Sequence, residues 1–145
     1  MQKEVSRWRI NILRAFYLFI AVVFGFSVWP TIINPGEIWD PLEGVAFSFW
    51  GALTLLSLFG VLHPLKMLPV LLMQLTYKAI WMLAVGAQLW LAGEIDPVAA
   101  ELVNANTIGI IIDLLVIPWP YVWATYILTS NPYKRTNFSK SEVNN

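Results

Sequence analysis

The sequence predicts an all-α fold, a single integral-membrane domain built as a four-helix transmembrane bundle. Two properties of the chain support this fold class. Of the 145 residues, 58% are hydrophobic and only 12% are charged, about half the charged fraction of a soluble domain. The charges also divide the chain into four long apolar stretches. The length leaves no room for a separate soluble domain, so all of it is assigned to the bundle and its short tails.

The first two stretches predict helices over about 8–31 and 41–62. Residues 15–33 carry no charge, and this run is too long for a signal peptide and has no small-residue cleavage site after it. Asp40 and Pro41 favour a helix start, because Asp caps free backbone N–H groups and Pro suits the first helical position. In the second helix a stripe of small residues at every fourth position, broken only by Leu56, lets membrane helices approach closely; it consists of Gly44, Ser48, Ala52 and Gly60.

The other two stretches predict helices over about 65–92 and 97–129. A span needs about 20 apolar residues, and the third stretch has that length with Lys78 as its only charge between Met67 and Gly93. The fourth begins at a second Asp-Pro pair outside the membrane, and Asp113 is its only charge within the membrane. A Lys in mid-span costs about 3 kcal/mol on insertion scales, so we expect it to face the protein interior or a wet cavity.

The basic residues predict the orientation of the bundle. Lys and Arg are concentrated in cytoplasmic segments of membrane proteins, and the two loops around Asp40 and Asp96 contain neither. Both termini and the turn at His63–Lys66 are therefore expected in the cytoplasm, and a bacterial plasma membrane is expected from the compact chain with no sorting signal. Of the nine basic residues, eight follow this rule: Lys3, Arg7, Arg9, Arg14, Lys66, Lys134, Arg135 and Lys140.

Composition argues against several classes of function. The chain has no Cys and one His, which excludes disulfides, thiolate metal sites and a bis-histidine haem within one chain. No nucleophile–base pair is visible, so no cofactor and no enzymatic activity are expected. A net charge of zero gives no reason to expect a nucleic-acid partner.

A short repeat divides the chain into two similar halves. Gly36–Pro41 reads GEIWDP and Gly93–Pro97 reads GEIDP, and each motif joins the two helices of one half. The similarity raises the possibility that the bundle consists of two repeated helical hairpins in parallel orientation, as in some small transporters. Chance similarity of one short motif is the alternative.

A polar stripe on the third helix supplies the candidate site. Gln74, Lys78, Trp81, Val85 and Gln88 are spaced by four and three residues, a period that directs them toward a neighbouring helix. Trp81 could offer its ring to the Lys78 ammonium as a cation–π partner. Two interpretations remain open: hydrogen bonds that hold helices or subunits together, or a ligand or ion pathway.

Asp113 is the expected counter-charge of Lys78. From the helix ends, Lys78 is placed slightly cytoplasmic of the midplane and Asp113 several ångströms on the other side. Side chains lean toward the N-terminus of their own helix, which separates these two further. Direct contact therefore requires a tilted helix, the full Lys stem, or a bridging water or Gln, and the pair is either structural or part of a transport relay.

Two prolines interrupt the fourth helix at Pro118 and Pro120, on either side of Trp119. Each removes a backbone donor and crowds the carbonyl four residues earlier. Broken membrane helices line binding sites when the freed carbonyl groups face a cavity, and otherwise they are simple kinks. Pro118, Trp119 and Pro120 therefore join the candidate residues of a ligand or ion pathway.

The sequence predicts a non-catalytic interaction component of a membrane, either a homo-oligomer or an accessory subunit of a larger complex. Short loops, the small residues of the second helix and the polar stripe of the third favour this function. The alternative is a small transporter or ligand-binding bundle that uses the intramembrane residues Gln74, Lys78 and Asp113. The lipid bilayer and other membrane subunits are the expected partners.

Overall fold

The fold is all-α, as the sequence predicts. A computed structural model describes residues 5–128, and within that range the chain forms helices and connecting turns with no strand. Four helices are long and apolar enough to cross a membrane by length and composition: Arg7–Ile33, Pro41–Leu62, Leu68–Ala92 and Pro97–Val116. The expected end of the fourth helix at Thr129 and the basic tail residues Lys134, Arg135 and Lys140 lie outside the described residues, as does Lys3.

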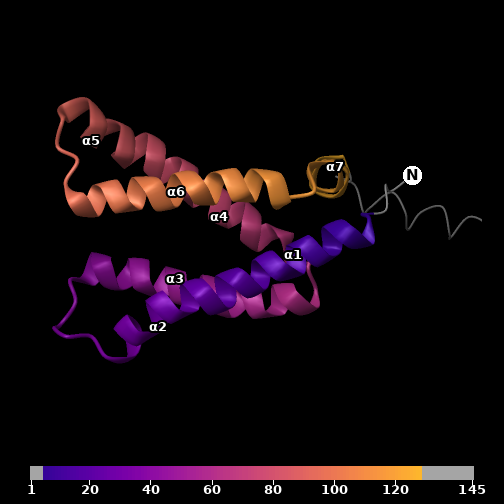
Figure 1. Cartoon of the computed structure of the whole chain (residues 1–145), viewed down its shortest axis with the longest axis horizontal. Coiled ribbons are helices and arrows are strands. Elements are labelled where there is room, and N and C mark those ends of the chain that lie inside the picture. Colours follow the sequence, from indigo (N-terminus) through magenta and orange to yellow (C-terminus); the bar gives the residue numbers. More distant parts are fainter. Residues whose placement is uncertain (1–4, 129–145) are drawn as a thin grey trace, which may run out of the picture. The chain divides into compact units, whose positions relative to one another are not determined.

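The first hairpin pairs a three-part helix with α3 (Figure 1). Its first helix consists of α1 (Arg7–Phe19), a π-helical segment η1 (Ile20–Phe24) and α2 (Gly25–Ile33), and its second is α3 (Pro41–Leu62). The first helix continues through Pro30, beyond the expected end near residue 31, and closes with a bond from Asn34 N–H to the Pro30 carbonyl of 3.0 Å.

The second hairpin pairs α4, η2 and α5 with α6. Its elements are α4 (Leu68–Trp81), the π-helical η2 (Met82–Gly86), α5 (Ala87–Ala92) and α6 (Pro97–Val116). Gly93 ends α5 with a φ of 71°, a left-handed conformation that glycine adopts without steric cost. The third span begins with α4 at Leu68 rather than near residue 65, because residues 63–67 form the turn between the hairpins.

Aspartates cap the two helices that start at the Asp-Pro pairs. Asp40 accepts a hydrogen bond from the Leu42 N–H at 2.9 Å, and Asp96 accepts one from the Ala99 N–H at 2.7 Å. Both predicted helix starts are therefore confirmed. Because each carboxylate also complements the positive end of its helix, the same chemistry fixes the entry of α3 and of α6.

Close packing and buried hydrogen bonds join α1 and α2 to α3. The ring of Tyr17 lies so near Gly60 that a Cβ there would overlap it, and the Tyr17 hydroxyl donates to the Pro64 carbonyl at 3.3 Å. Nearer the other end, the Trp29 indole donates to Thr54 Oγ1 at 2.9 Å. Hydrogen bonds of this kind hold helices together where burial of apolar surface gives no advantage over lipid.

Contacts of α3 with α4 and of α1 with α6 connect the two hairpins. One of the contacts between α3 and α4 is aromatic: the rings of Phe49 and Tyr77 meet edge to face, with centroids 5.1 Å apart. Buried Leu13, Leu53, Leu68 and Leu71 add apolar packing. These contacts all belong to the compact unit Ser6–Ile117.

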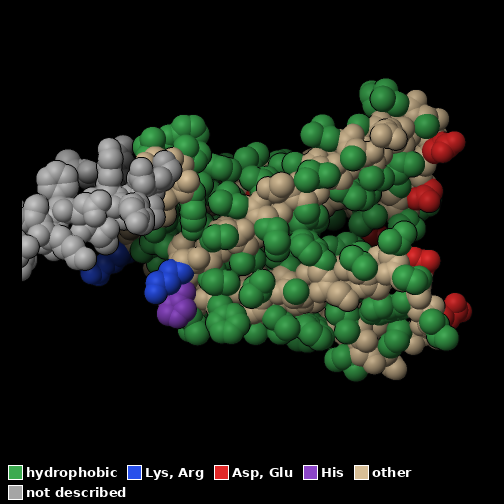
Figure 2. All heavy atoms as spheres, turned by 180° about the vertical axis from the view of Figure 1, so that it is seen from behind, with side chains coloured by type: hydrophobic (Ala, Val, Ile, Leu, Met, Phe, Trp, Pro, Cys, Tyr) green, Lys and Arg blue, Asp and Glu red, His purple; other side chains and the backbone are tan. Residues whose placement is uncertain are grey.

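Hydrophobic side chains cover much of the visible face, and charged ones gather at its ends (Figure 2). Acidic side chains lie at one end, and Lys, Arg and His side chains lie at the other. The acidic end corresponds to the loops that carry Asp40 and Asp96, and the basic end to the turn with His63 and Lys66. This separation agrees with four antiparallel spans, because their successive connections alternate between the two ends of the bundle.

The predicted fourth helix breaks at Ile117 and Pro118, immediately after α6. Ile117 is extended, with φ −63° and ψ 125°, and Pro118 has φ −78° and ψ 80°. A short helix α7 (Trp119–Val122) and a π-helical segment η3 (Trp123–Ile127) follow. Because Ile117 leaves the helical conformation, the α-helix begun at Pro97 ends at Val116, and Pro118 lies outside the compact unit Ser6–Ile117.

Candidate functional site

The facing sides of α4 and α6 bring three polar side chains together. Lys78 Nζ lies 3.2 Å from Asp113 Oδ2. Gln74 Nε2 donates to both oxygens of the same carboxylate, at 3.3 Å to Oδ1 and 3.4 Å to Oδ2. Gln74, Lys78 and Asp113 thus form one hydrogen-bonded group, which we call the polar triad.

The triad is enclosed within the protein. Its exposed fractions are 0% for Asp113, 4% for Gln74 and 8% for Lys78. A single charge buried in this way would be strongly unfavourable, whereas an ion pair with an added amide donor offsets part of the desolvation cost. Both Lys78 and Gln74 therefore contribute hydrogen bonds to the buried Asp113 carboxylate.

Helical geometry explains two of the three positions. Gln74 and Lys78 are one turn apart on α4 and so project from the same face. Gly109 lies one turn before Asp113 on α6, and a Cβ at this position would collide with the end of the Lys78 side chain. The missing side chain of Gly109 lets the Lys78 stem cross the surface of α6 to reach Asp113.

Gly109 is the residue of this site that sequence reasoning missed. Its spacing of four residues from Asp113 was the available signal, since residues i and i+4 share one helix face. A glycine one turn from a lone intramembrane carboxylate leaves a gap beside it. That gap is where a long side chain from a neighbouring helix can lie.

The polar stripe expected on α4 does not continue past Trp81. Gln88 is exposed, and Gly86 is buried. The reason is η2, since a π-turn holds one residue more than an α-turn and rotates the following residues about the helix axis. Trp81 is half-buried, and its ring lies 3.4 Å from the position of a Cβ on Gly86. Residues 5–128 give Lys78 no ring partner.

Pro118, Trp119 and Pro120 belong to the unit that starts at Pro118. Within that unit the Pro118 carbonyl accepts hydrogen bonds from Tyr121 N–H at 2.9 Å and Val122 N–H at 3.0 Å, which begin α7. Trp119 is exposed, at 39%. A role of these three residues in a pathway stays a prediction.

Aromatic side chains of α3 lie beside α4, and their contacts continue toward the acidic end of the molecule. Tyr77 of α4 contacts Phe49, and its hydroxyl lies near the Trp50 indole. Trp50 meets Phe47 edge to face at 5.3 Å, and Phe47 stacks with Trp39 at 5.1 Å. Trp50 is half-buried and packs among aromatic neighbours.

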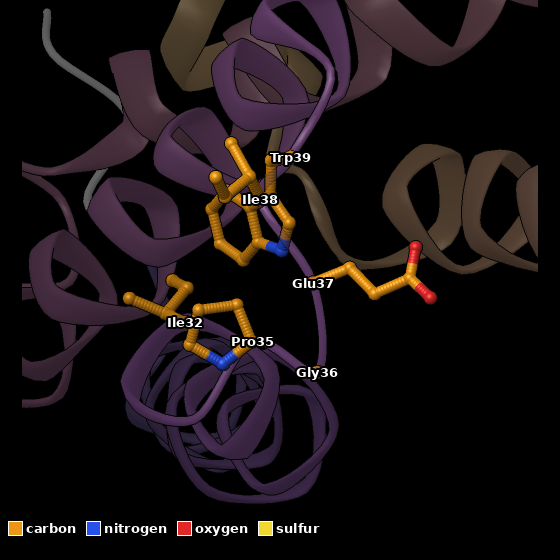
Figure 3. Close-up of a pocket in the computed structure, with 6 residues that line it drawn as sticks. All are labelled: Ile32, Pro35, Gly36, Glu37, Ile38 and Trp39. Carbon is orange, nitrogen blue, oxygen red and sulfur yellow. The ribbon is translucent and has the colours of Figure 1, made fainter.

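Two surface hollows lie elsewhere on the molecule. The first follows the loop after α2 and is lined by apolar side chains including Ile32 and Trp39, while the Glu37 carboxylate extends away from them (Figure 3). The second lies along η1 and α2 and includes Gly25 and Trp29. No member of the polar triad lines either hollow, and the triad is instead closed by packing.

The chemistry of the triad is that of an ion pair with an amide donor. Residues 5–128 contain no group of three His, Cys, Asp or Glu side chains that could hold a metal ion. No protein-family model, no curated protein and no solved structure matches this chain.

Proposed function

We propose that this protein is a non-catalytic interaction component of a membrane, present as a homo-oligomer or as an accessory subunit of a larger complex. The observation that carries the proposal is the pairing of Lys78 with Asp113 inside one chain. A charged pair satisfied by its own chain holds α4 and α6 together and leaves the outer surface for lipid and other proteins.

The outer face of α6 is the surface best suited to a partner. Of the residues in its most apolar 18-residue stretch, only 11% are buried against described residues, compared with 28% in each of the other three spans. Ile108, Ile111 and Leu115 are among its exposed side chains. A span with so little burial against residues 5–128 gains most from packing against a neighbouring helix, since close van der Waals contact drives association in lipid.

Gln88 supports the same function. It is exposed within the third span, and no residue between 5 and 128 forms a hydrogen bond with its side chain. An amide facing lipid gains from hydrogen bonds to a neighbouring helix, with a typical value of about 0.6 to 2 kcal/mol in membranes. The polar stripe is thus divided into two parts. Gln74 and Lys78 join α4 to α6 within the chain, and Gln88 is free to face a partner.

The proposal includes an orientation and a location. The positive-inside rule puts the basic end, with Arg7 and Lys66, in the cytoplasm and the loops of Asp40 and Asp96 on the other side. Both termini are then cytoplasmic. A bacterial plasma membrane is the proposed location.

A second candidate function is a small transporter or ligand-binding bundle. The observation in its favour is that Gln74 Oε1 is buried without a hydrogen-bond donor among residues 5–128. Lys78→Met separates the two functions. Loss of assembly or stability supports a structural pair, whereas a folded assembly that has lost binding or flux supports transport.

Native mass spectrometry of the protein, extracted gently from its own membrane, tests the interaction function. We expect a defined oligomer or a stoichiometric foreign subunit. A lone chain with a reproducible small-molecule adduct would support the second candidate instead. A bare monomer would contradict the proposal that the protein is an accessory subunit.

Cross-linking tests the α6 surface with a matched control. The chain has no Cys, so an introduced thiol is its only one. Ile111 on α6 is 53% exposed and Leu55 on α3 is 48% exposed, and each follows the first residue of its helix by the same number of positions. Carrying a thiol-attached photo-cross-linker, Ile111→Cys is expected to capture a protein neighbour and Leu55→Cys to react with lipid. Equal capture at both positions would contradict a partner on α6.

A further inference from the structure

The hydrogen-bonding capacity of the polar triad exceeds what the described residues fill. Gln74 is 4% exposed, and its Oε1 accepts no hydrogen bond from residues 5–128. A buried acceptor left without a donor destabilises the folded state, because it has lost its hydrogen bonds to water and gained none in the protein. Since buried polar atoms in native proteins are nearly always paired with protein or with an ordered water, this oxygen requires a donor.

Rotating the amide does not supply that donor. The nitrogen now faces Asp113, at 3.3 Å from Oδ1 and 3.4 Å from Oδ2. The opposite orientation would direct the amide oxygen at the carboxylate oxygens and lose both hydrogen bonds. The carboxylate therefore fixes which end of the amide faces it, and Oε1 is the end that is left over.

Lys78 has the complementary surplus. Its ammonium carries three N–H donors, and within the described part of the chain it has one acceptor, Asp113 Oδ2 at 3.2 Å. Gln74 Nε2 contacts the same Oδ2, so the ammonium and the amide share one acceptor atom. A missing donor and unused donors thus occur within one enclosed cluster.

We propose that a hydroxyl group bridges Lys78 and Gln74 at this site. Its oxygen accepts a hydrogen bond from Lys78 Nζ, and its O–H donates to Gln74 Oε1. Few other groups meet both demands, because a second cation is repelled by the ammonium and a bare anion cannot donate. The hydroxyl belongs to a water molecule or to a bound alcohol. This inference goes beyond the proposed interaction function and does not depend on it.

An experimental structure of the full chain in a lipid environment, at a resolution that shows ordered water, tests the bridge. We expect density within hydrogen-bonding distance, about 2.7–3.2 Å, of both Lys78 Nζ and Gln74 Oε1. An isolated spherical peak identifies water. Elongated density together with a matching mass adduct identifies the hydroxyl of a bound alcohol. Direct contact of Nζ with Oε1, or an empty space between them, overturns the proposal.

Variants of Gln74 and Thr76 provide the control. Gln74→Leu removes the acceptor, and the bridging density is expected to disappear while the Lys78–Asp113 contact persists. Thr76→Val changes an exposed residue of the same helix, whose hydroxyl bonds only the Leu72 carbonyl in the described structure, and the density is expected to remain. Unchanged density in Gln74→Leu would overturn the role of Oε1. The parent structure decides the question alone if Gln74→Leu does not fold.

Discussion

Lys78 and Asp113 make each other's burial tolerable. Asp113 has no exposed surface and Lys78 has 8%, so removing one side chain leaves the other as an uncompensated charge. Such single removals cost about 3–5 kcal/mol in proteins, whereas replacing both partners by apolar groups is far less costly. The pair is therefore a coupled unit, and its two members are informative only when changed both singly and together.

Lys78→Met and Asp113→Leu, alone and combined, test this coupling. Each single variant is expected to lower the free energy of unfolding by about 3–5 kcal/mol, and the double variant by clearly less than the sum. The measurement is unfolding in mixed micelles, with Thr76→Val as the control that should change little. Additive losses would show that the two residues do not act as a pair.

Gly109 gives a prediction of the opposite kind, because the substitution to Ala adds an atom rather than removing one. Ala is the better helix former by about 1 kcal/mol, but at this position its Cβ collides with the end of Lys78. Gly109→Ala is expected to destabilise by about 1–3 kcal/mol, as over-packing does, and to displace the ammonium from Asp113.

Gly44→Ala is the matched control for Gly109→Ala. It lies in α3, and its Cβ would meet only a Trp39 ring atom at 3.4 Å. Unfolding measurements should find this variant unchanged or slightly stabilised. If Gly109→Ala behaved like Gly44→Ala, the gap beside Asp113 would not be needed by Lys78.

At the scale of elements, the π-helical η2 determines which residues of the third span face inward. It adds one residue to the helix, so Gly86 occupies the buried position that an uninterrupted α-helix would give to Val85. Removing one residue from η2 should convert it to an α-helix while keeping Lys78 and Gly86 on the same face.

Deletion of the exposed Ala84 tests this register. We expect the shortened chain to fold and to elute as the parent does in size-exclusion chromatography, with a similar melting temperature. Deletion of the exposed Leu58 is the control, because α3 has no π-helical segment to absorb the loss. That variant should misfold. Equal damage by both deletions would contradict the role of η2.

The same element separates what the sequence could predict from what it could not. The four apolar stretches and the two Asp-Pro caps were sufficient to locate four long helices, since length and capping chemistry are local properties, but the fourth α-helix ends at Val116 rather than near residue 129. Gln74, Lys78 and Asp113 could be paired as the lone polar groups of neighbouring spans. The exposure of Gln88 could not be foreseen. A π-turn depends on packing against other helices, and the spacing of polar residues along the sequence does not reveal it. The clearance at Gly109 likewise depends on a residue 31 positions away along the chain.

For the whole molecule, the separation of acidic and basic ends leads to a topology prediction. Ile38 is fully exposed in the first acidic loop and Ile95 is partly exposed in the second, while Lys66 lies in the basic turn. With single Cys variants in intact cells, an impermeant maleimide is expected to label positions 38 and 95 directly. Position 66 should react only after the membrane is opened. The reverse pattern would contradict the positive-inside orientation.

The location of the ion pair within one hairpin has a consequence for biosynthesis. Lys78 and Asp113 are 35 residues apart in the chain, and ribosomes add about 5–20 residues per second. For roughly 2–7 s after Lys78 is made, its partner does not exist. During that interval, insertion of the third span alone places an unpaired Lys78 in hydrocarbon, at a cost of about 3 kcal/mol on insertion scales. That cost favours entry of the second hairpin into the membrane as a pair of helices.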